Sequence, residues 1–157
     1  MPTWIGIDPG LGGAFGAIEE NGRVHLFDTP TLQIGTKRDY NMPKMREILT
    51  GWKDPRVVIE SVHALPGQGV TSMFNFGKGF GIWLGLLAGL EIPFDLVTPQ
   101  RWKKVMLDGV AKDKDAARLR AMSLFPRVAD RLERVMDDGR AESLLMAEYL
   151  RRLHGGR

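Results

Sequence analysis

The chain has 157 residues, enough for one domain, and with 43% hydrophobic and 26% charged residues it has the composition of a globular protein with a buried core. It contains no cysteine, which excludes disulfide frameworks, thiolate metal sites, cysteine nucleophiles and iron–sulfur clusters. The formal charge of +3 is unevenly distributed: residues 1–100 carry 8 basic and 10 acidic side chains, whereas residues 101–157 carry 14 basic and 9 acidic ones. A basic final third favours a polyanionic partner such as nucleic acid, although a solvated surface has the same composition.

The first residues lead directly into a strand-like segment without the pattern of a signal peptide. The longest apolar run, residues 79–90, is too short to cross a bilayer. We therefore expect a cytoplasmic protein with no membrane contact. Asparagine and glutamine occur three times each, and this scarcity of thermolabile residues points to a thermophilic source.

In chain order, the hydrophobic pattern first predicts three strands, at residues 4–8, 14–19 and 23–27. A proline- and glycine-rich turn at 9–13 separates the first two strands, and Asn21-Gly22 is a strong hairpin signal before the third. Residues 28–41 have the composition of an irregular connection. The remaining elements are a helix at 42–49, a strand at 56–60, a helix at 71–90, a strand at 93–98, and helices at 100–106, 113–125 and 137–153.

This order predicts an α/β fold formed by a single domain over residues 1–157. The first three strands would form an antiparallel meander, and the two later strands would join it in parallel through helical crossovers. The result is a five-stranded mixed sheet flanked by helices. Ligands of such sheets collect at the carboxyl ends of the strands.

Acidic residues stand where the predicted fold would gather them. Asp8 and Glu60 each end an apolar strand, and Asp138 and Glu142 are four residues apart on one face of the last helix. Close carboxylates repel one another and tend to hold a proton or a cation; oxygen ligands suit Mg²⁺, and two such ions can promote phosphodiester hydrolysis. A turn-forming role for Asp8 and helix capping by Asp137 and Asp138 are the structural alternatives.

Four segments together resemble the RuvC-like Holliday junction resolvases of the ribonuclease H-like superfamily. They are residues 5–10 (IGIDPG), 57–60 (VVIE), 76–81 (FGKGFG) and 141–147 (AESLLMA), in the family's order. The resemblance implies a ribonuclease H-like fold and a crossover junction endodeoxyribonuclease: a metal-dependent, structure-selective enzyme that resolves DNA four-way junctions by paired symmetric nicks. It also implies Mg²⁺, with Mn²⁺ as a substitute, and no organic cofactor. The compact length is similar to that of phage members, so the host would be a bacterial or phage-infected cell.

The resemblance also assigns the catalytic, metal-binding residues as Asp8, Glu60, Asp138 and Glu142. The family usually places its last two acids three residues apart, but the position three before Glu142 is Gly139. Asp138, or else Asp137, must then supply the remaining carboxylate.

The candidate DNA contacts combine a basic cluster with aromatic residues. They are His63, Phe74, Lys78, Arg101, Lys103, Lys104, Lys112, Lys114 and Arg118. By resemblance, Lys112 and Lys114 fall where the family places lysines near the scissile phosphate. His63 occupies the position of a base-stacking phenylalanine in the cellular enzymes, and Phe74 is the alternative.

The long helix carries Gly77, Gly81, Gly85 and Gly89 at four-residue spacing. Each glycine costs about 1 kcal/mol relative to alanine inside a helix, so a stripe of them indicates close backbone approach. The approaching surface is either the protein's own sheet or a second copy of the helix; the resemblance implies a homodimer.

Two other functions fit part of the pattern. A non-catalytic protein that binds branched DNA would share the basic surface, and an actin-like or sugar-kinase-like ATPase also begins with Asp-x-Gly after a strand. Such ATPases duplicate the fold and need a second phosphate loop, whereas 157 residues hold one copy.

Overall fold

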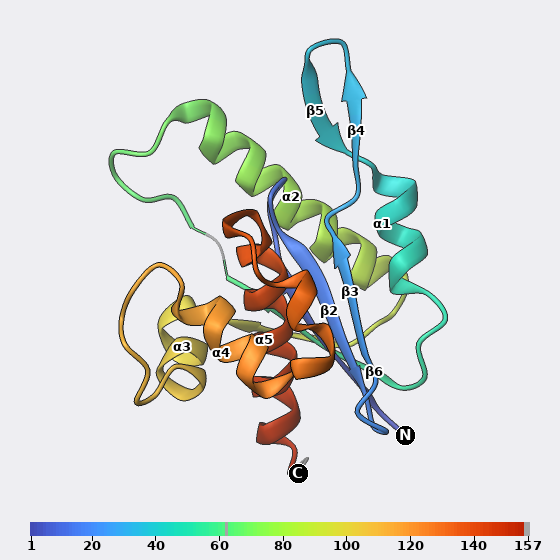
Figure 1. Ribbon diagram of the computed structural model, residues 1–157. Coiled ribbons are helices and arrows are strands. Elements are labelled where there is room, and N and C mark those ends of the chain that lie inside the picture. The colour runs from blue at the N-terminus through green and yellow to red at the C-terminus, as the bar shows by residue number, and fades with distance from the viewer. Residues whose placement is uncertain (62, 156–157) are drawn as a thin grey trace.

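The computed structural model describes residues 1–61 and 63–155 of the chain. A five-stranded sheet lies at its centre, with the order β3-β2-β1-β6-β7 (Figure 1). Its strands are β1 (Thr3–Asp8), β2 (Ala14–Glu19), β3 (Val24–Asp28), β6 (Pro55–Glu60) and β7 (Phe94–Val97). The first three pair antiparallel, while β6 runs parallel to both β1 and β7. The predicted five-stranded mixed sheet is confirmed. Two further strands lie between β3 and β6 in the chain.

Those further strands correct the prediction for residues 28–41, which are not an irregular connection. β4 (Thr31–Ile34) and β5 (Lys37–Tyr40) form a separate hairpin that projects from the body of the molecule (Figure 1). Residues 32–38 are all exposed, so the hairpin lacks the alternating apolar pattern by which a strand is recognised. Buried Tyr40 anchors its base, because its hydroxyl donates a hydrogen bond to the Asn75 carbonyl at 2.8 Å.

Helices cover both faces of the sheet. On one face lie α1 (Met42–Leu49) and α2 (Val70–Gly89), and on the other lie α3 (Pro99–Met106), α4 (Ala116–Leu124) and α5 (Asp138–Leu153). Short 3₁₀ segments, Pro126–Arg131 and Val135–Asp137, lead into α5. α4 begins three residues later than predicted, since residues 113–115 form a turn. Within the described chain, no helix combines the length and apolarity needed to cross a membrane.

The alternation of side chains along β1 and β6 sets which face each acid occupies. In β1, Ile5 and Ile7 pack with the apolar cluster beneath α1 and α2, while Trp4 packs with the cluster beneath α5. Asp8 has the same parity as Trp4, so it faces α5. Glu60 shares the parity of Val58, which also belongs to the α5 cluster. Both strand-end carboxylates therefore project toward the same helix.

Two glycines let α5 approach the sheet closely. Gly6 of β1 and Gly16 of β2 are partners in the strand register. A Cβ atom on Gly6 would overlap the Ser143 carbonyl and lie 2.6 Å from the Ala147 nitrogen, and one on Gly16 would lie 2.9 Å from the Leu144 nitrogen. The absence of side chains at this pair brings the helix backbone onto the strands.

We expect Gly6→Ala to lower the free energy of unfolding by about 1–3 kcal/mol, because the added methyl group meets helix backbone that cannot turn aside. Gly12→Ala is the matched control, since a Cβ there meets nothing within 4 Å. Urea unfolding of both variants measures the difference. Equal stabilities would contradict the close contact between α5 and β1.

Candidate functional site

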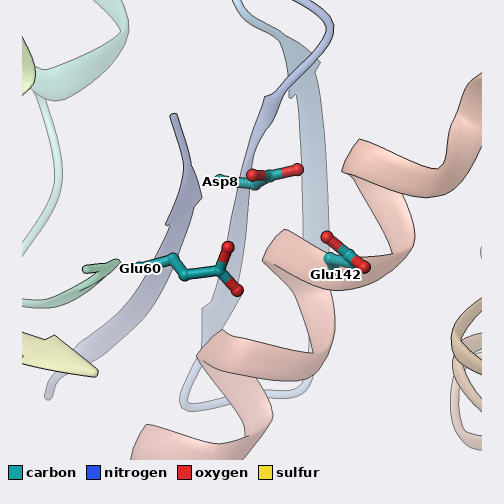
Figure 2. A group of neighbouring side chains, drawn as sticks. All are labelled: Asp8, Glu60 and Glu142. Carbon is teal, nitrogen blue, oxygen red and sulfur yellow. The ribbon is translucent and has the colours of Figure 1, made fainter. Parts of the chain in front are cut away.

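Three carboxylates converge at the carboxyl end of the central strands. Asp8 ends β1, Glu60 ends the parallel neighbour β6, and Glu142 lies in the second turn of α5. Each offers an oxygen such that all three atoms lie within 4.8 Å of one another. Figure 2 shows the side chains directed into the space between the two strands and the helix. The structure thus brings three of the four predicted acids together.

The first turn of α5 is tied to the same edge of the sheet. The Arg140 guanidinium donates hydrogen bonds to both carboxylate oxygens of Asp28, at 2.7 and 2.8 Å. Asp28 ends β3 and lies in register with Ala14, which in turn pairs with Asp8. Gly139 fits against the turn between β1 and β2, where a Cβ would lie 2.6 Å from the Gly12 carbonyl oxygen. The position at which the family usually has an acid is thus closed to any side chain.

Burial and mutual repulsion perturb the acids. The pKa of Asp8 is raised well above its usual value, first by burial and then by the charges of Glu142 and Glu60. Burial also raises the pKa of Glu142, against the opposing effect of Lys103, whose Nζ lies 3.6 Å from its carboxylate. The cluster is short of positive charge, so it favours binding a proton or a cation.

Asp138 lies at the border of this cluster, outside the group of three. Its Oδ1 accepts a hydrogen bond from Arg118 Nε at 2.8 Å, yet its charge contributes to raising the pKa of both Asp8 and Glu142. Asp137, the alternative, is 1% exposed and its carboxylate is held by Arg134 at the start of α5. Of the two neighbours, Asp138 is the one next to the carboxylates.

Arg118 does not match its predicted role in DNA binding. Its side chain is 8% exposed, and its guanidinium bonds to Asp138, Asp115 and the Glu133 carbonyl. These partners engage all three guanidinium nitrogens inside the protein, so Arg118 joins α4 to α5.

Trp102 is a residue of this site that the sequence did not reveal. Its indole Nε1 donates a hydrogen bond to Glu60 Oε2 at 2.7 Å. The side chain is completely buried among core residues, and a tryptophan on the apolar side of an amphipathic helix is normally assigned to the core. No spacing rule relates it to Glu60, which is 42 residues away.

A lysine-rich groove opens beside Glu142. Its volume is about 890 Å³, and its lining includes Lys103, Lys104, Lys112 and Lys114. The four lysines of the predicted basic cluster therefore lie along one groove next to the acidic centre, with Lys103 nearest to it. Arg101 is exposed on α3 and does not line the groove.

A second groove of about 450 Å³ lies beside Glu60 and shares Gln100 with the first. His63 and Phe76 line it, while Phe74 is 71% exposed and does not. Of the two predicted stacking residues, His63 is the one next to the carboxylates. Phe76 also covers the turn after β1, because a Cβ on Gly10 would lie 3.1 Å from its ring.

Lys78, the remaining predicted DNA contact, binds the β4–β5 hairpin. Its ammonium group pairs with both carboxylate oxygens of Asp39, at 2.7 and 2.9 Å. This ion pair ties α2 to β5, so the charge of Lys78 is partly neutralised.

Comparison with solved structures identifies the architecture. RuvC of Thermus thermophilus aligns with a TM-score of 0.67 over 99% of this chain and 98% of its own, at 16% sequence identity. RuvC from T. thermophilus in complex with Holliday junction substrate aligns equally well, at 14% identity. The chain has the RuvC fold. The resemblance indicated by the four sequence motifs is therefore confirmed at the level of the fold.

Sequence comparison finds a partial similarity to a named resolvase. The chain is 34% identical over 91 residues, 58% of its length, to the chloroplastic Holliday junction resolvase MOC1 of Chlamydomonas reinhardtii. It spans about a tenth of the length of that protein. No protein-family model matches the chain.

The raised pKa values predict an unusual pH dependence of stability. In a chelating buffer, we expect the free energy of unfolding to fall as the pH rises above the ordinary pKa of a carboxyl group, since the folded chain keeps protons on Asp8 and Glu142 that the unfolded chain has released. This contribution to stability is full below the ordinary carboxyl pKa of the unfolded chain and is lost as the pH rises through the raised pKa of the folded chain. Asp8→Asn should flatten this dependence and stabilise the protein at the alkaline end of the range, where the wild type carries the buried charge.

Urea unfolding at several pH values tests this expectation. Asp95→Asn is the control, because Asp95 is exposed on β7 and lines a surface hollow apart from the three acids. It should keep the wild-type slope. A slope that Asp8→Asn leaves unchanged would contradict the electrostatic description of the site.

Proposed function

We propose that residues 1–157 act as one ribonuclease H-like nuclease domain, a metal-dependent and structure-selective DNA endonuclease that resolves four-way junctions by paired symmetric nicks. The observation that carries this proposal is the trio of carboxylates within 4.8 Å, which stands between a lysine-lined groove and a second groove on the RuvC fold. The local likeness to a Holliday junction resolvase supports the same substrate. We also propose that the enzyme acts in the cytoplasm of a bacterial or phage-infected cell.

The donor set fits a hard divalent cation. All three groups offer carboxylate oxygen, and burial together with the neighbouring acids raises the pKa values of Asp8 and Glu142, an effect that a cation would oppose. Asp8, Glu60 and Glu142 would hold Mg²⁺, or Mn²⁺ in its place, with Asp138 as the neighbouring fourth acid. When bound, such ions activate water and stabilise the leaving oxygen of a phosphodiester.

The chain's own side chains would perform the remaining work. Lys103, Lys112 and Lys114 would neutralise phosphate charge along the groove that reaches Glu142. His63 would stack on a base in the groove that reaches Glu60. A DNA strand lying across both grooves would bring one of its phosphates to the carboxylates between them.

A homodimer would match the two-fold symmetry of paired nicks. The glycine stripe supports it, because Gly77, Gly81, Gly85 and Gly89 are exposed and a Cβ at each meets nothing within 4 Å. Packing of the stripe on the protein's own sheet is wrong: the inward side of α2 consists of Gly79, Trp83 and Leu87. Val70 and Phe74, 87% and 71% exposed, extend the open face toward the start of α2.

Removing either strand-end carboxylate should abolish cutting while leaving binding nearly intact. We expect Asp8→Asn and Glu60→Gln to lower the rate of junction cleavage by at least about 10³-fold, because each variant loses a charged ligand. Electrophoresis of a labelled four-way junction with Mg²⁺ gives the rate, and binding in Ca²⁺ or chelator gives the affinity.

Asp95→Asn serves again as the control and should cut at the wild-type rate. Cleavage by Asp8→Asn at the wild-type rate would overturn the catalytic assignment. Binding without cleavage by the unmodified chain would instead identify a non-catalytic junction-binding protein.

The oligomeric state tests the role of the open face of α2. We expect a dimer by light scattering at micromolar concentration, and a monomer when Gly81 and Gly85 are both replaced by Gln, because side chains on this face would separate the helices. Leu119→Gln, at a 55% exposed position on α4, should remain dimeric. A wild-type monomer would contradict the dimer.

A further inference from the structure

The hydrogen bond between Trp102 and Glu60 links the core of the protein to its acidic centre. The indole nitrogen lies 2.7 Å from Glu60 Oε2, and the Trp102 side chain has no exposed area. Figure 2 shows the Glu60 carboxylate reaching from the end of β6 toward Asp8 and α5. One oxygen of this carboxylate is therefore engaged by a donor that cannot move into solvent.

The backbone around this contact is fixed from both sides. Glu60 is the register partner of Val97, and the next residue, Ser61, donates its backbone N–H to the Val97 carbonyl at 2.7 Å. The Thr98 hydroxyl then caps α3 by accepting the Arg101 N–H at 3.3 Å. Trp102 therefore lies one helical turn after the end of β7, and that end is hydrogen-bonded to the residue that follows Glu60.

The hydrogen bond to Glu60 distinguishes Trp102 from a tryptophan that contributes packing alone. Phenylalanine or leucine would fill an apolar site without bringing a buried N–H group that needs an acceptor. Trp83 makes the contrast within the same chain: it is equally buried, on the opposite face of the sheet, and its Nε1 has no hydrogen-bond partner among the described residues. The core accommodates an indole without a bond, whereas at Trp102 the bond is made to an acid of the site.

We propose that Trp102 is a positioning residue for the metal centre, which holds Glu60 by one carboxylate oxygen so that the other is presented to a divalent cation. This inference rests on the proposed metal site. The donor restrains a flexible side chain before any ion arrives, and the cation then meets a carboxylate already turned toward Asp8 and Glu142. In other metal sites, loss of a side chain that hydrogen-bonds to a metal ligand typically weakens metal binding by about 10–100-fold.

The test measures metal affinity in the absence of DNA. Mn²⁺ is titrated calorimetrically into the wild type, Trp102→Phe and Trp83→Phe. We expect roughly 10–100-fold weaker binding for Trp102→Phe. Binding should be unchanged for Trp83→Phe, in which the same substitution removes a buried indole that has no bond to the site. In cleavage assays, Trp102→Phe should require more metal for half-maximal rate and regain most of the rate at saturating metal.

A measurement on the unmodified protein covers the case in which Trp102→Phe does not fold. The indole N–H signals of the four tryptophans are followed by ¹⁵N NMR during Mg²⁺ titration. The Trp102 signal should shift with metal, and the Trp83 signal should stay in place.

The outcomes separate the two proposals. Metal binding by the wild type with equal affinity in Trp102→Phe, or a Trp102 signal that ignores bound metal, would overturn the positioning role alone. A wild type that binds no metal would overturn the metal centre and this inference with it.

Discussion

The contact of α5 with β1 and β2 is the constraint on which the site depends. Only hydrogen occupies the space between Gly6, Gly16 and the helix backbone, so α5 lies directly on the sheet. This places Glu142 over strand ends that already carry Asp8 and Glu60 on the matching face. A helix held away by ordinary side chains would leave two carboxylates on the sheet and a third out of reach. The close packing of α5 and the proximity of the three carboxylates therefore have the same structural cause.

The electrostatic cost of that arrangement explains the surroundings. Burial, and after it the proximity of the other carboxylates, raises the pKa of Asp8 and Glu142, and Lys103 on the neighbouring helix offsets part of the repulsion. Trp102, on the same turn of α3, satisfies one oxygen of Glu60. Buried charge is tolerated only when partners or a cation compensate it, so each of these contacts fits a site prepared for a metal ion.

The same arrangement sorts the basic residues by role. Arg118 and Arg140 form ion pairs within the chain, the first with Asp138 and the second with Asp28 at the surface, and both hold the beginning of α5. Lysines on α3 and the following turn stay open along the groove beside Glu142. Arginine's fixed, multidentate donors suit the internal clamps, whereas flexible lysines suit a mobile phosphate chain. The charge excess of the final third therefore serves structure as well as any nucleic-acid partner.

Sequence alone determined the five strands of the central sheet, the order of the helices, and the acids at two strand ends, because apolar periodicity and turn residues are local signals. It also indicated Glu142 through the resemblance of its helix to a known family. Only the tertiary structure decided that Asp138 pairs with Arg118, that Trp102 reaches Glu60, and that residues 28–41 form an exposed hairpin. Those features depend on contacts between residues distant in the chain or on strands without a buried face. Neither kind of contact leaves a periodic trace in the sequence.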